Sequence, residues 1–356
     1  MLQQRGAITY NEINQQRDTL QDTIKIINEM RQDLVTWFRQ EAFTQVVFTG
    51  AGSSYNASLA SAKLFMSLTG VTSYAFPSSE ILFSGKLPFE ERRKTLIVAM
   101  SRSGQSSETL WAIDKIKELS KNSKIMVICP HPDSEIIPKA DKTIVIEKAK
   151  EEATVSTKAF SSFVFAVKII TGLLMQNMPF LTELTKVPSM FETKKYQVEI
   201  QQKVIASKFT SVLVAGSGSY YGLACEGSLL MKKISNTPSE ACHVLELRHG
   251  NAAYGTNQSL VVILASDSLK KGEGVVVGEL AAMKCPRLVI CEEADSRLGN
   301  SDFVFELKSG LSELSRDMLM MPILQELAFY TAISKAYNPD KPKHVVPFIK
   351  WKEPYF

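Results

Sequence analysis

The sequence predicts an α/β protein with two mainly parallel sheets, each a doubly wound, flavodoxin-like layer between helices. Short apolar runs rich in β-branched residues alternate with helical patterns along the chain, which is the order of right-handed βαβ units. These runs are apolar throughout, as expected of strands buried on both faces. The same order starts again in the second half, so we expect a tandem duplication of one domain, with an N-terminal helix and a short C-terminal tail.

Length and composition are those of an ordinary folded protein. The 356 residues are 45% hydrophobic and 22% charged, which excludes a disordered or collagen-like chain and leaves room for two domains. The net charge of +4 without a dense basic tract gives no reason to expect nucleic acid. No apolar run reaches the roughly 18 residues of a membrane span, and the polar start is unlike a signal peptide. We therefore expect no membrane association.

Cysteines and histidines indicate the compartment and the absence of a metal. Five cysteines without a CxxC pair predict reduced thiols in a cytoplasmic protein. The four histidines form no HExxH pattern, so we expect neither a metal site nor a cofactor.

The first half begins with a predicted helix over residues 10–38, where apolar side chains recur at three- and four-residue steps. Helices are also expected over 57–68 and 108–119. Four apolar runs are predicted to be strands, namely 46–50, 95–100, 124–129 and 142–147.

The second half repeats the first at an offset of about 166 positions, far longer than the period of a solenoid repeat. Gly50 aligns with Gly216, and Ser53 aligns with Ser219. Later predicted strands keep nearly this offset, at 259–264, 287–291 and 303–307. We therefore expect an N-terminal helical segment, two copies of one domain and a tail, with boundaries at 1–38, 39–195, 196–340 and 341–356.

The first candidate loop, TGAGSSYNAS over residues 49–58, follows the first strand. Glycines and serines at the start of a helix offer backbone N–H groups, hydroxyls and the positive helix end to an anion. The loop matches neither the dinucleotide fingerprint nor the P-loop. A purely structural role is the alternative, because small residues also let a helix pack closely on a strand.

The second candidate loop, SRSGQSSET over residues 101–109, also follows a strand. Ser103 and Ser106 can bind phosphate oxygens, and Arg102 can add positive charge. Alternatively, Ser106 or Ser107 serves only as a helix N-cap. Because ligands of open parallel sheets bind beyond the carboxyl ends of the strands, we expect both loops to hold one phosphate.

A third segment, EEATVSTKAF over residues 151–160, follows the fourth strand and opens a helix. Ser156 and Thr157 are candidate caps, and Lys158 adds a cation. An ordinary capped helix is the alternative interpretation.

Taken as a set and in this order, the three motifs and the second copy resemble the sugar isomerase (SIS) family of phosphosugar-binding proteins. The likeness extends to the isomerase half of glucosamine-6-phosphate synthase and to stand-alone hexosamine-6-phosphate deaminases and deglycases, over nearly the whole chain. The resemblance implies a sugar phosphate as ligand. Its implied phosphate ligands are Ser53, Ser54, Ser101, Arg102, Ser103 and Ser106. Val155 and Ser156 would meet the sugar hydroxyls, partly through the backbone, and Lys158 would flank the site.

The resemblance also implies residues for proton transfer between C1 and C2 and for ring opening. Residues 225–251 resemble the family's catalytic segment, and His249 matches its ring-opening histidine. In family members this histidine reaches the site of the neighbouring subunit, so a homodimer is implied. The alternative is that His249 only makes bonds within its own loop.

The base is where the chain departs from the family. Lys233 stands where relatives have glutamate, Leu230 where the synthases have an active-site lysine, and Pro347 where they have the lysine that contacts the sugar carbonyl. A lysine is protonated near neutral pH unless its surroundings lower its pKa. The candidate bases are therefore a deprotonated Lys233 or a displaced carboxylate. These carboxylates are Glu226, Glu240 and Glu246.

Three functions remain open from the sequence. The first is an enzyme with altered chemistry, a deaminase or a deglycase acting on a 6-phosphorylated amino sugar or sugar–amine adduct. The others are a non-catalytic phosphosugar sensor and a hexose-6-phosphate isomerase. The enzyme is favoured because His249 is kept. The chain starts at the first helix of the isomerase pattern, so we expect no glutamine-hydrolysing domain and no amide transfer from glutamine.

Overall fold

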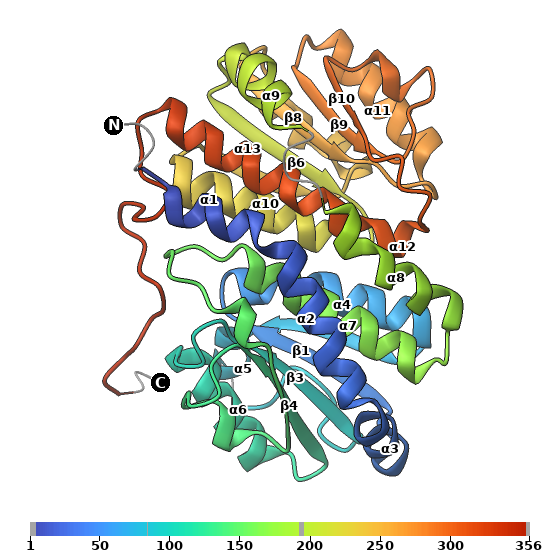
Figure 1. The fold of residues 1–356 in the computed structure, drawn as a ribbon, viewed down its shortest axis with the longest axis vertical. Coiled ribbons are helices and arrows are strands. Elements are labelled where there is room, and N and C mark those ends of the chain that lie inside the picture. The colour runs from blue at the N-terminus through green and yellow to red at the C-terminus, as the bar shows by residue number, and fades with distance from the viewer. Residues whose placement is uncertain (1–4, 84, 192–195, 354–356) are drawn as a thin grey trace. The chain divides into compact units, whose positions relative to one another are not determined.

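The computed structural model of the chain describes residues 5–83, 85–191 and 196–353 (Figure 1). None of the helices within these ranges is long and apolar enough to cross a membrane.

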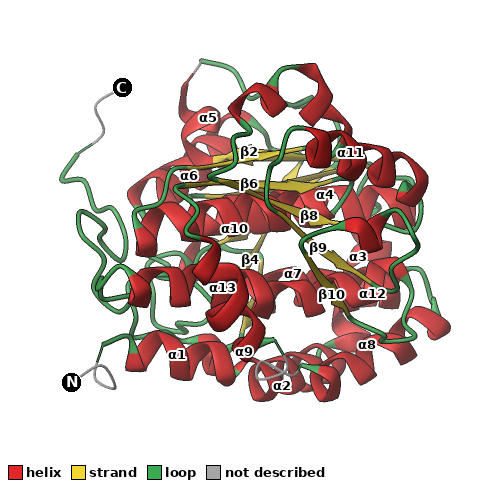
Figure 2. Ribbon diagram, turned by 90° about the horizontal axis from the view of Figure 1, so that it is seen from above, coloured by secondary structure: helices red, strands yellow, loops and turns green. Residues whose placement is uncertain are grey.

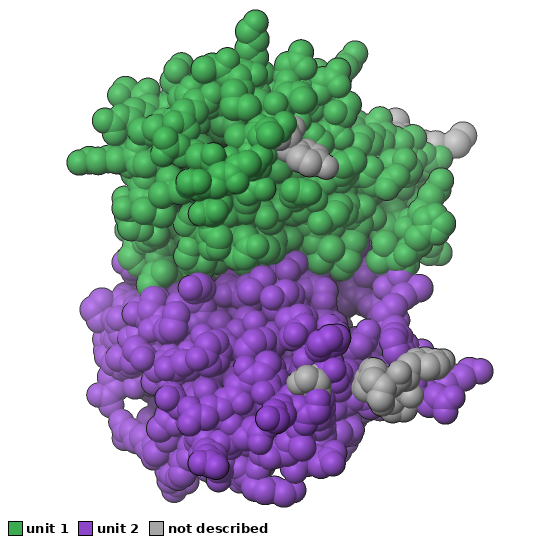
Figure 3. Space-filling view, turned by 180° about the vertical axis from the view of Figure 1, so that it is seen from behind, with its two compact units in different colours: residues 1–14, 189–345 green, residues 15–188, 346–356 purple. Residues whose placement is uncertain are grey.

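The chain divides into two compact units, coloured separately in Figure 3. Unit 1 consists of residues 1–14 and 189–345, and unit 2 consists of residues 15–188 and 346–356. The C-terminal tail therefore belongs to unit 2, although the residues that precede it belong to unit 1. The domain boundaries expected from the sequence stay predictions.

The N-terminal segment is three helices, so the prediction of one helix over 10–38 is wrong. They are α1 (Ala7–Asn14), α2 (Gln16–Glu29) and α3 (Arg31–Glu41). The break after α1 coincides with the boundary between the units, because α1 lies in unit 1 and the other two lie in unit 2. The apolar periodicity continues across both breaks, which explains why the sequence reads as one helix.

Unit 2 contains a five-stranded parallel sheet of order β2-β1-β3-β4-β5. Figure 2 shows the strands of the protein in yellow among helices in red. Its strands are β1 (Gln45–Gly50), β2 (Thr72–Pro77), β3 (Thr95–Met100), β4 (Ser123–Cys129) and β5 (Lys142–Val145). β1, β3 and β4 are almost wholly buried, which confirms the parallel strands predicted there. β2 was not predicted, because this edge strand is largely part-exposed and has no continuous apolar run.

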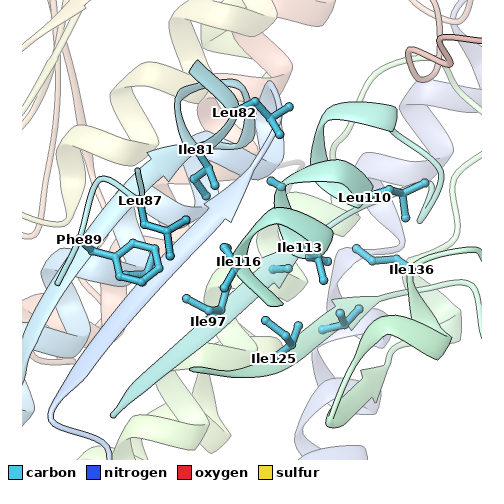
Figure 4. Packing of buried hydrophobic residues seen from close by; sticks show 14 of the residues in the cluster. Ile81, Leu82, Leu87, Phe89, Ile97, Leu110, Ile113, Ile116, Ile125 and Ile136 are labelled. Carbon is cyan, nitrogen blue, oxygen red and sulfur yellow. The ribbon is translucent and has the colours of Figure 1, made fainter. Parts of the chain in front are cut away.

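Helices cover both faces of this sheet. Among them are α4 (Ser53–Thr69), α5 (Ser78–Phe83), α6 (Ser107–Leu119) and α7 (Lys158–Leu174); α8 (Met178–Met190) follows α7. In Figure 4, Ile113 and Ile116 of α6 pack with Ile97 and Ile125 of the sheet, all fully buried. This burial fixes α6 so that it begins just beyond the carboxyl end of β3.

Unit 1 contains a second parallel sheet, of order β10-β9-β8-β6-β7. Its strands are β6 (Ser211–Gly216), β7 (Ser239–Cys242), β8 (Ser259–Leu264), β9 (Arg287–Cys291) and β10 (Phe303–Glu306). The longest helices of this unit are α10 (Tyr220–Ser235), α11 (Lys270–Ala282) and α13 (Met321–Ser334); α9 (Gln197–Glu199) and α12 (Glu313–Arg316) are short. The α/β prediction with two parallel sheets is confirmed.

Candidate functional site

The sheet of unit 2 has a topological switch point between β1 and β3. The chain leaves β1 to form β2 on one side and then crosses back to form β3 on the other. At such a point the outgoing loops diverge and leave a crevice at the carboxyl ends of the strands, where ligands of doubly wound sheets bind. The first two candidate loops leave the sheet here.

The ends of β1 and β3 approach closely because residue 50 is glycine. A Cβ added to Gly50 would lie 2.7 Å from the Cβ of Ser54 and 2.9 Å from the carbonyl oxygen of Met100. Below them, the hydroxyl of Ser78 lies 3.2 Å from that of Thr49 and 3.1 Å from that of Thr109. The close approach at Gly50 places the first turn of α4 against the ends of β1 and β3, and the hydroxyl of Ser78 joins β1 to α6, which follows the second loop.

The first loop delivers two serines to the start of a long helix. Gly52 precedes α4 with φ of 59°, a backbone conformation that glycine adopts without strain. α4 therefore begins at Ser53, earlier than the predicted start at residue 57, and Ser53 and Ser54 are buried in its first turn. The start of a helix carries unsatisfied N–H groups and partial positive charge, which favour an anion.

In the second loop two serine hydroxyls are oriented by backbone donors. The Oγ of Ser101 accepts a hydrogen bond from the N–H of Gly104 at 3.0 Å, and the Oγ of Ser103 accepts one from the N–H of Gln105 at 3.1 Å. A serine hydroxyl that accepts a hydrogen bond keeps its own proton to donate. Both side chains are thus prepared as donors to an anionic oxygen.

The N-cap interpretation of the second loop is wrong. Ser106 occupies the N-cap position of α6, but its side chain makes no capping hydrogen bond. Ser107 instead binds the C-terminal tail: its N–H donates to the carbonyl oxygen of Ile349 at 3.1 Å, and its Oγ accepts from the N–H of Trp351 at 2.9 Å. The hydroxyls of this loop are therefore not explained by helix capping.

Arg102 connects the second loop with two other segments of unit 2. Its guanidinium donates to the carbonyl oxygens of Ala153 at 3.2 Å, Thr154 at 2.8 Å and Pro347 at 2.6 Å. A carboxylate oxygen of Glu151 lies 3.8 Å away. Arg102 thus donates most of its hydrogen bonds to backbone carbonyls of the protein. These bonds hold its positive charge beside the second loop.

The third segment is capped by a residue that the sequence did not suggest. One carboxylate oxygen of Glu151 accepts hydrogen bonds from the N–H of Thr157 at 2.6 Å, from its hydroxyl at 3.0 Å and from the N–H of Ala159 at 3.2 Å. Thr157 is the N-cap residue but makes no side-chain capping bond. The expected cap at Ser156 or Thr157 is therefore wrong, and the start of α7 already holds an anion.

The predicted sugar-facing residues lie in this segment. Val155, Ser156 and Lys158 are all buried. The Nζ of Lys158 donates to the side-chain oxygen of Gln15 at 2.7 Å. This bond fixes the side chain of Lys158, which is the first residue of α7.

His131 also lies on this edge of the sheet, and the sequence interpretation did not consider it. It follows the carboxyl end of β4, and its N–H donates to the Sγ of Cys129 at 3.4 Å. Burial, followed by the charges of Lys150 and Arg102, lowers the pKa of His131. Its position two residues after a predicted strand was the signal that could have identified it.

The three predicted catalytic residues all lie in unit 1, on different elements. Lys233 is half-buried in the last turn of α10, and Glu240 is exposed on β7. His249 is exposed at the end of a 3₁₀ turn, Leu245–His249. Of the displaced carboxylates, Glu226 is fully buried and Glu246 is exposed.

The sheet of unit 1 shows how a loop at this edge binds an anion. After β8, the Oε2 of Glu313 accepts hydrogen bonds from the N–H groups of Asp267 and Ser268, each at 3.1 Å. The carboxylate of Glu273 accepts from the N–H of Ser266 at 2.8 Å and from its hydroxyl at 3.0 Å. In unit 1 these donors therefore already serve the chain's own carboxylates.

No metal site accompanies these residues in the part of the chain that is described. There, no cluster of three His, Cys, Asp or Glu side chains could hold a metal ion.

Comparison with known proteins identifies a domain within unit 2. Residues 41–171, which run from the end of α3 into α7 and include the whole sheet of unit 2, match the SIS domain family. The chain therefore contains a SIS domain within unit 2. The phosphosugar family that the sequence motifs resemble is thereby confirmed.

Relatives of this SIS-domain protein include a glutamine–fructose-6-phosphate aminotransferase (isomerizing) from Caldanaerobacter subterraneus. It is 26% identical over 358 aligned residues, covering 94% of this chain and 57% of that protein. The chain thus spans about half the length of the curated relatives it matches.

Two solved structures share the fold. Tagatose-6-phosphate ketose/aldose isomerase from Escherichia coli has a TM-score of 0.85 at 15% identity, covering 97% of this chain and 96% of that one. Glucosamine-6-phosphate deaminase from Thermotoga maritima has a TM-score of 0.74 at 24% identity, covering 93% and 100%. At these identities the likeness shows the fold alone.

Proposed function

We propose that the SIS-domain protein binds a sugar phosphate in the crevice of unit 2. The observation that carries this proposal is the orientation of the Ser101 and Ser103 hydroxyls, each of which accepts a loop N–H and keeps a proton to donate. The proposed phosphate ligands are Ser53, Ser54, Ser101, Ser103 and Ser106, with Arg102 supplying charge beside them. The carboxylates bound by the corresponding loop of unit 1 support this use of the loop.

The sugar is proposed to extend from the phosphate towards the third segment. Arg102 holds this segment beside the second loop through the carbonyls of Ala153 and Thr154. In the proposal, Val155 and Ser156 meet sugar hydroxyls and Lys158 flanks them. The cap supplied by Glu151 supports this arrangement, because the start of α7 does not need a second anion.

We propose further that the protein is an enzyme that releases an amine from a 6-phosphorylated amino sugar or sugar–amine adduct. His249 opens the ring as acid, and Lys233 or Glu240 moves a proton from C2 to C1. A 2-amino aldose then becomes the C2 imine of a ketose, whose C=N bond is hydrolysed by water to release ammonia and a ketose 6-phosphate. For an adduct that carries its amine on C1 of a ketose, the proton moves from C1 to C2 instead, and water hydrolyses the C1 imine to release the amine and an aldose 6-phosphate. The names of the similar proteins, an aminotransferase, a deaminase and an isomerase, support this class of chemistry.

The assembly proposed with this chemistry is a homodimer in which His249 enters the site of the neighbouring subunit. The exposure of His249 on the surface of unit 1 supports the proposal. We also propose that the two units arose by duplication, because their sheets have the same strand order. All five cysteines are unpaired, which supports a cytoplasmic location as a proposal.

A phosphosugar sensor is the second candidate function. It is favoured by Pro347, which has no side-chain amine and is held through its carbonyl by Arg102. A hexose-6-phosphate isomerase is the third, and its proton transfer would use the same base.

Turnover assays separate these functions. The purified protein is incubated with glucosamine 6-phosphate, galactosamine 6-phosphate and fructoselysine 6-phosphate, and released ammonia or lysine is measured together with hexose 6-phosphate. We expect at least one of them to be consumed, and we expect His249→Ala to abolish the reaction. Binding without turnover would instead identify a sensor, and interconversion of hexose 6-phosphates without amine release would identify an isomerase. If none of the sugar phosphates binds, the proposed site itself is wrong.

A further inference from the structure

Unit 1 contains a basic pocket of about 530 Å³ at the C-terminal end of α10. Its walls come from three separate parts of the chain: residue 5, residues 232–236 and residues 336–344. Twelve described residues line it, and none of them is acidic. Its cationic lining residues are Arg5, Lys232, Lys233, Lys341 and Lys343. This volume lies within the range of pockets that bind small molecules.

Hydrogen bonds hold the two terminal walls of this basic pocket together. The side-chain oxygen of Asn338 accepts from the N–H of Gly6 at 3.1 Å. The carboxylate of Asp340 accepts from the N–H of Thr9 at 2.7 Å, from its hydroxyl at 2.8 Å and from the N–H of Ile8 at 3.3 Å. The backbone segments that carry Arg5, Lys341 and Lys343 are therefore anchored to each other.

The carboxylate of Asp340, which lies in the same terminal segment, is already engaged. Asp340 does not line the pocket, and its carboxylate is bound at the start of α1. The guanidinium of Arg5 donates to the carbonyl oxygen of Ala336 at 3.1 Å, and the Nζ of Lys343 lies 5.9 Å from the ring centre of Tyr337. These contacts orient the two cations without supplying a carboxylate to neutralise them.

Helix electrostatics explain only part of this charge. Lys232 and Lys233 occupy the last turn of α10, where cations are stabilised by the helix dipole. Arg5, Lys341 and Lys343 come from other segments, so the dipole of α10 does not account for their position. Like charges around one cavity repel each other, and a bound anion would remove this repulsion.

We propose that the basic pocket binds a small anion carrying three or more negative charges, such as a polyphosphate. A single phosphate group carries about two negative charges and would leave about half of the charge of Arg5, Lys232, Lys341 and Lys343 unbalanced. Lysine ammonium groups suit phosphate oxygens as flexible point charges with three donors each. Every lining residue belongs to unit 1, whereas the proposed sugar-phosphate loops belong to unit 2, so the basic pocket uses none of the phosphate-binding residues of those loops.

The test is calorimetric titration of the full chain with inorganic tripolyphosphate, citrate and orthophosphate. We expect tripolyphosphate to bind at least about tenfold more tightly than orthophosphate, and binding to weaken as salt is raised. Citrate matches the charge without phosphate, so binding of tripolyphosphate alone identifies a phosphate site, and equal binding of both identifies a general polyanion site. Failure of both to bind would overturn the proposal.

Two double variants locate the site. Lys341→Glu with Lys343→Glu reverses two charges of the pocket and leaves Lys233 in place; we expect it to weaken tripolyphosphate binding about tenfold or more. Lys270→Glu with Lys271→Glu makes the same charge change at the start of α11, away from the lining residues, and should leave binding unchanged. Equal loss in both double variants would contradict a specific pocket.

A third variant separates this inference from the proposed function. Ser103→Ala should weaken binding of a sugar phosphate but leave tripolyphosphate binding unchanged. Loss of tripolyphosphate binding in Ser103→Ala would place the polyanion on the loops of unit 2 and overturn the proposal.

Discussion

The guanidinium of Arg102 donates a 2.6 Å hydrogen bond to the carbonyl oxygen of Pro347 in the C-terminal tail. The same side chain binds the carbonyls of Ala153 and Thr154. A few residues farther along, the tail pairs with Ser107 through Ile349 and Trp351. Arg102 therefore fastens both the third segment and the tail to the second loop.

The first prediction separates the bonds of Arg102 to the third segment from its bond to the C-terminal tail. Arg102→Ala removes all of them, whereas truncation after Val345 removes only the tail. We expect Arg102→Ala to weaken sugar-phosphate binding by about tenfold or more, since hydrogen bonds to charged groups contribute roughly 1.5–3 kcal/mol. The truncated chain keeps the bonds to Ala153 and Thr154 and should lose less affinity, as measured by calorimetry.

Lys350→Ala is the matched control in the tail. Lys350 forms a surface ion pair with Glu135, and such pairs contribute little. Lys350→Ala should therefore bind the sugar phosphate with the same affinity as the wild type. If the truncation weakened binding as much as Arg102→Ala, the tail and not the third segment would be the part that Arg102 positions.

The second prediction concerns the serine hydroxyls. Ser103→Ala removes a donor to the phosphate and should weaken sugar-phosphate binding by roughly 1–3 kcal/mol, or about 5- to 150-fold. Ser67→Ala is the control, because Ser67 is exposed on α4 and donates to the carbonyl oxygen of Leu64 in the same helix. Equal affinities for both variants and the wild type would remove Ser103 from the site.

The third prediction tests the shared site by mixing two impaired variants, assayed at a substrate concentration too low to saturate Ser103→Ala. Ser103→Ala damages the phosphate loop, and His249→Ala removes the proposed acid. If His249 serves the neighbouring subunit, each mixed dimer has one site with both residues intact. Random exchange of subunits should then restore about a quarter of the wild-type sites. Ammonia or lysine release is measured before and after mixing; activity that stays at the level of the separate variants would place both residues in one subunit.

The central strands and the loops that follow them could be predicted from the sequence because their signals are local. β1 and β3 are continuous apolar runs, and each is followed by glycine and serine residues. In a parallel sheet the carboxyl ends of neighbouring strands lie at one edge, so strand assignment alone brings the two loops together.

The remaining features depend on contacts between residues distant in sequence or on subtle local geometry. Arg102 and Pro347 are far apart along the chain, and no sequence pattern predicts the hydrogen bond between them. Glu151 caps α7 from outside the helix, so a search for a serine or threonine cap points to Thr157 instead. β2 lies at the sheet edge and lacks the continuous apolar run of a buried strand. Such features require the folded structure.

The last prediction concerns a buried carboxyl group that is separate from the proposed chemistry. Glu326 lies inside unit 1, and Gln197 donates to its Oε1 at 2.8 Å. Burial raises the pKa of Glu326 from 4.5 to about 8. The folded protein therefore retains a proton that the unfolded chain releases. This contribution to stability is complete below pH 4.5 and is lost progressively as the pH rises to about 8.

Glu326→Gln keeps the shape of the protonated side chain and cannot ionise, so it should escape this loss. We expect a melting temperature close to that of the wild type at pH 5 and several degrees higher at pH 8, at about 2–4 °C per kcal/mol. Thermal unfolding followed by circular dichroism measures both. Glu293→Gln, an exposed change in the same unit, should shift neither value. Some pH dependence should persist in Glu326→Gln, because burial also raises the pKa of Glu273 to about 7. A variant no more stable than the wild type at pH 8 would show that Glu326 ionises in the folded protein without cost.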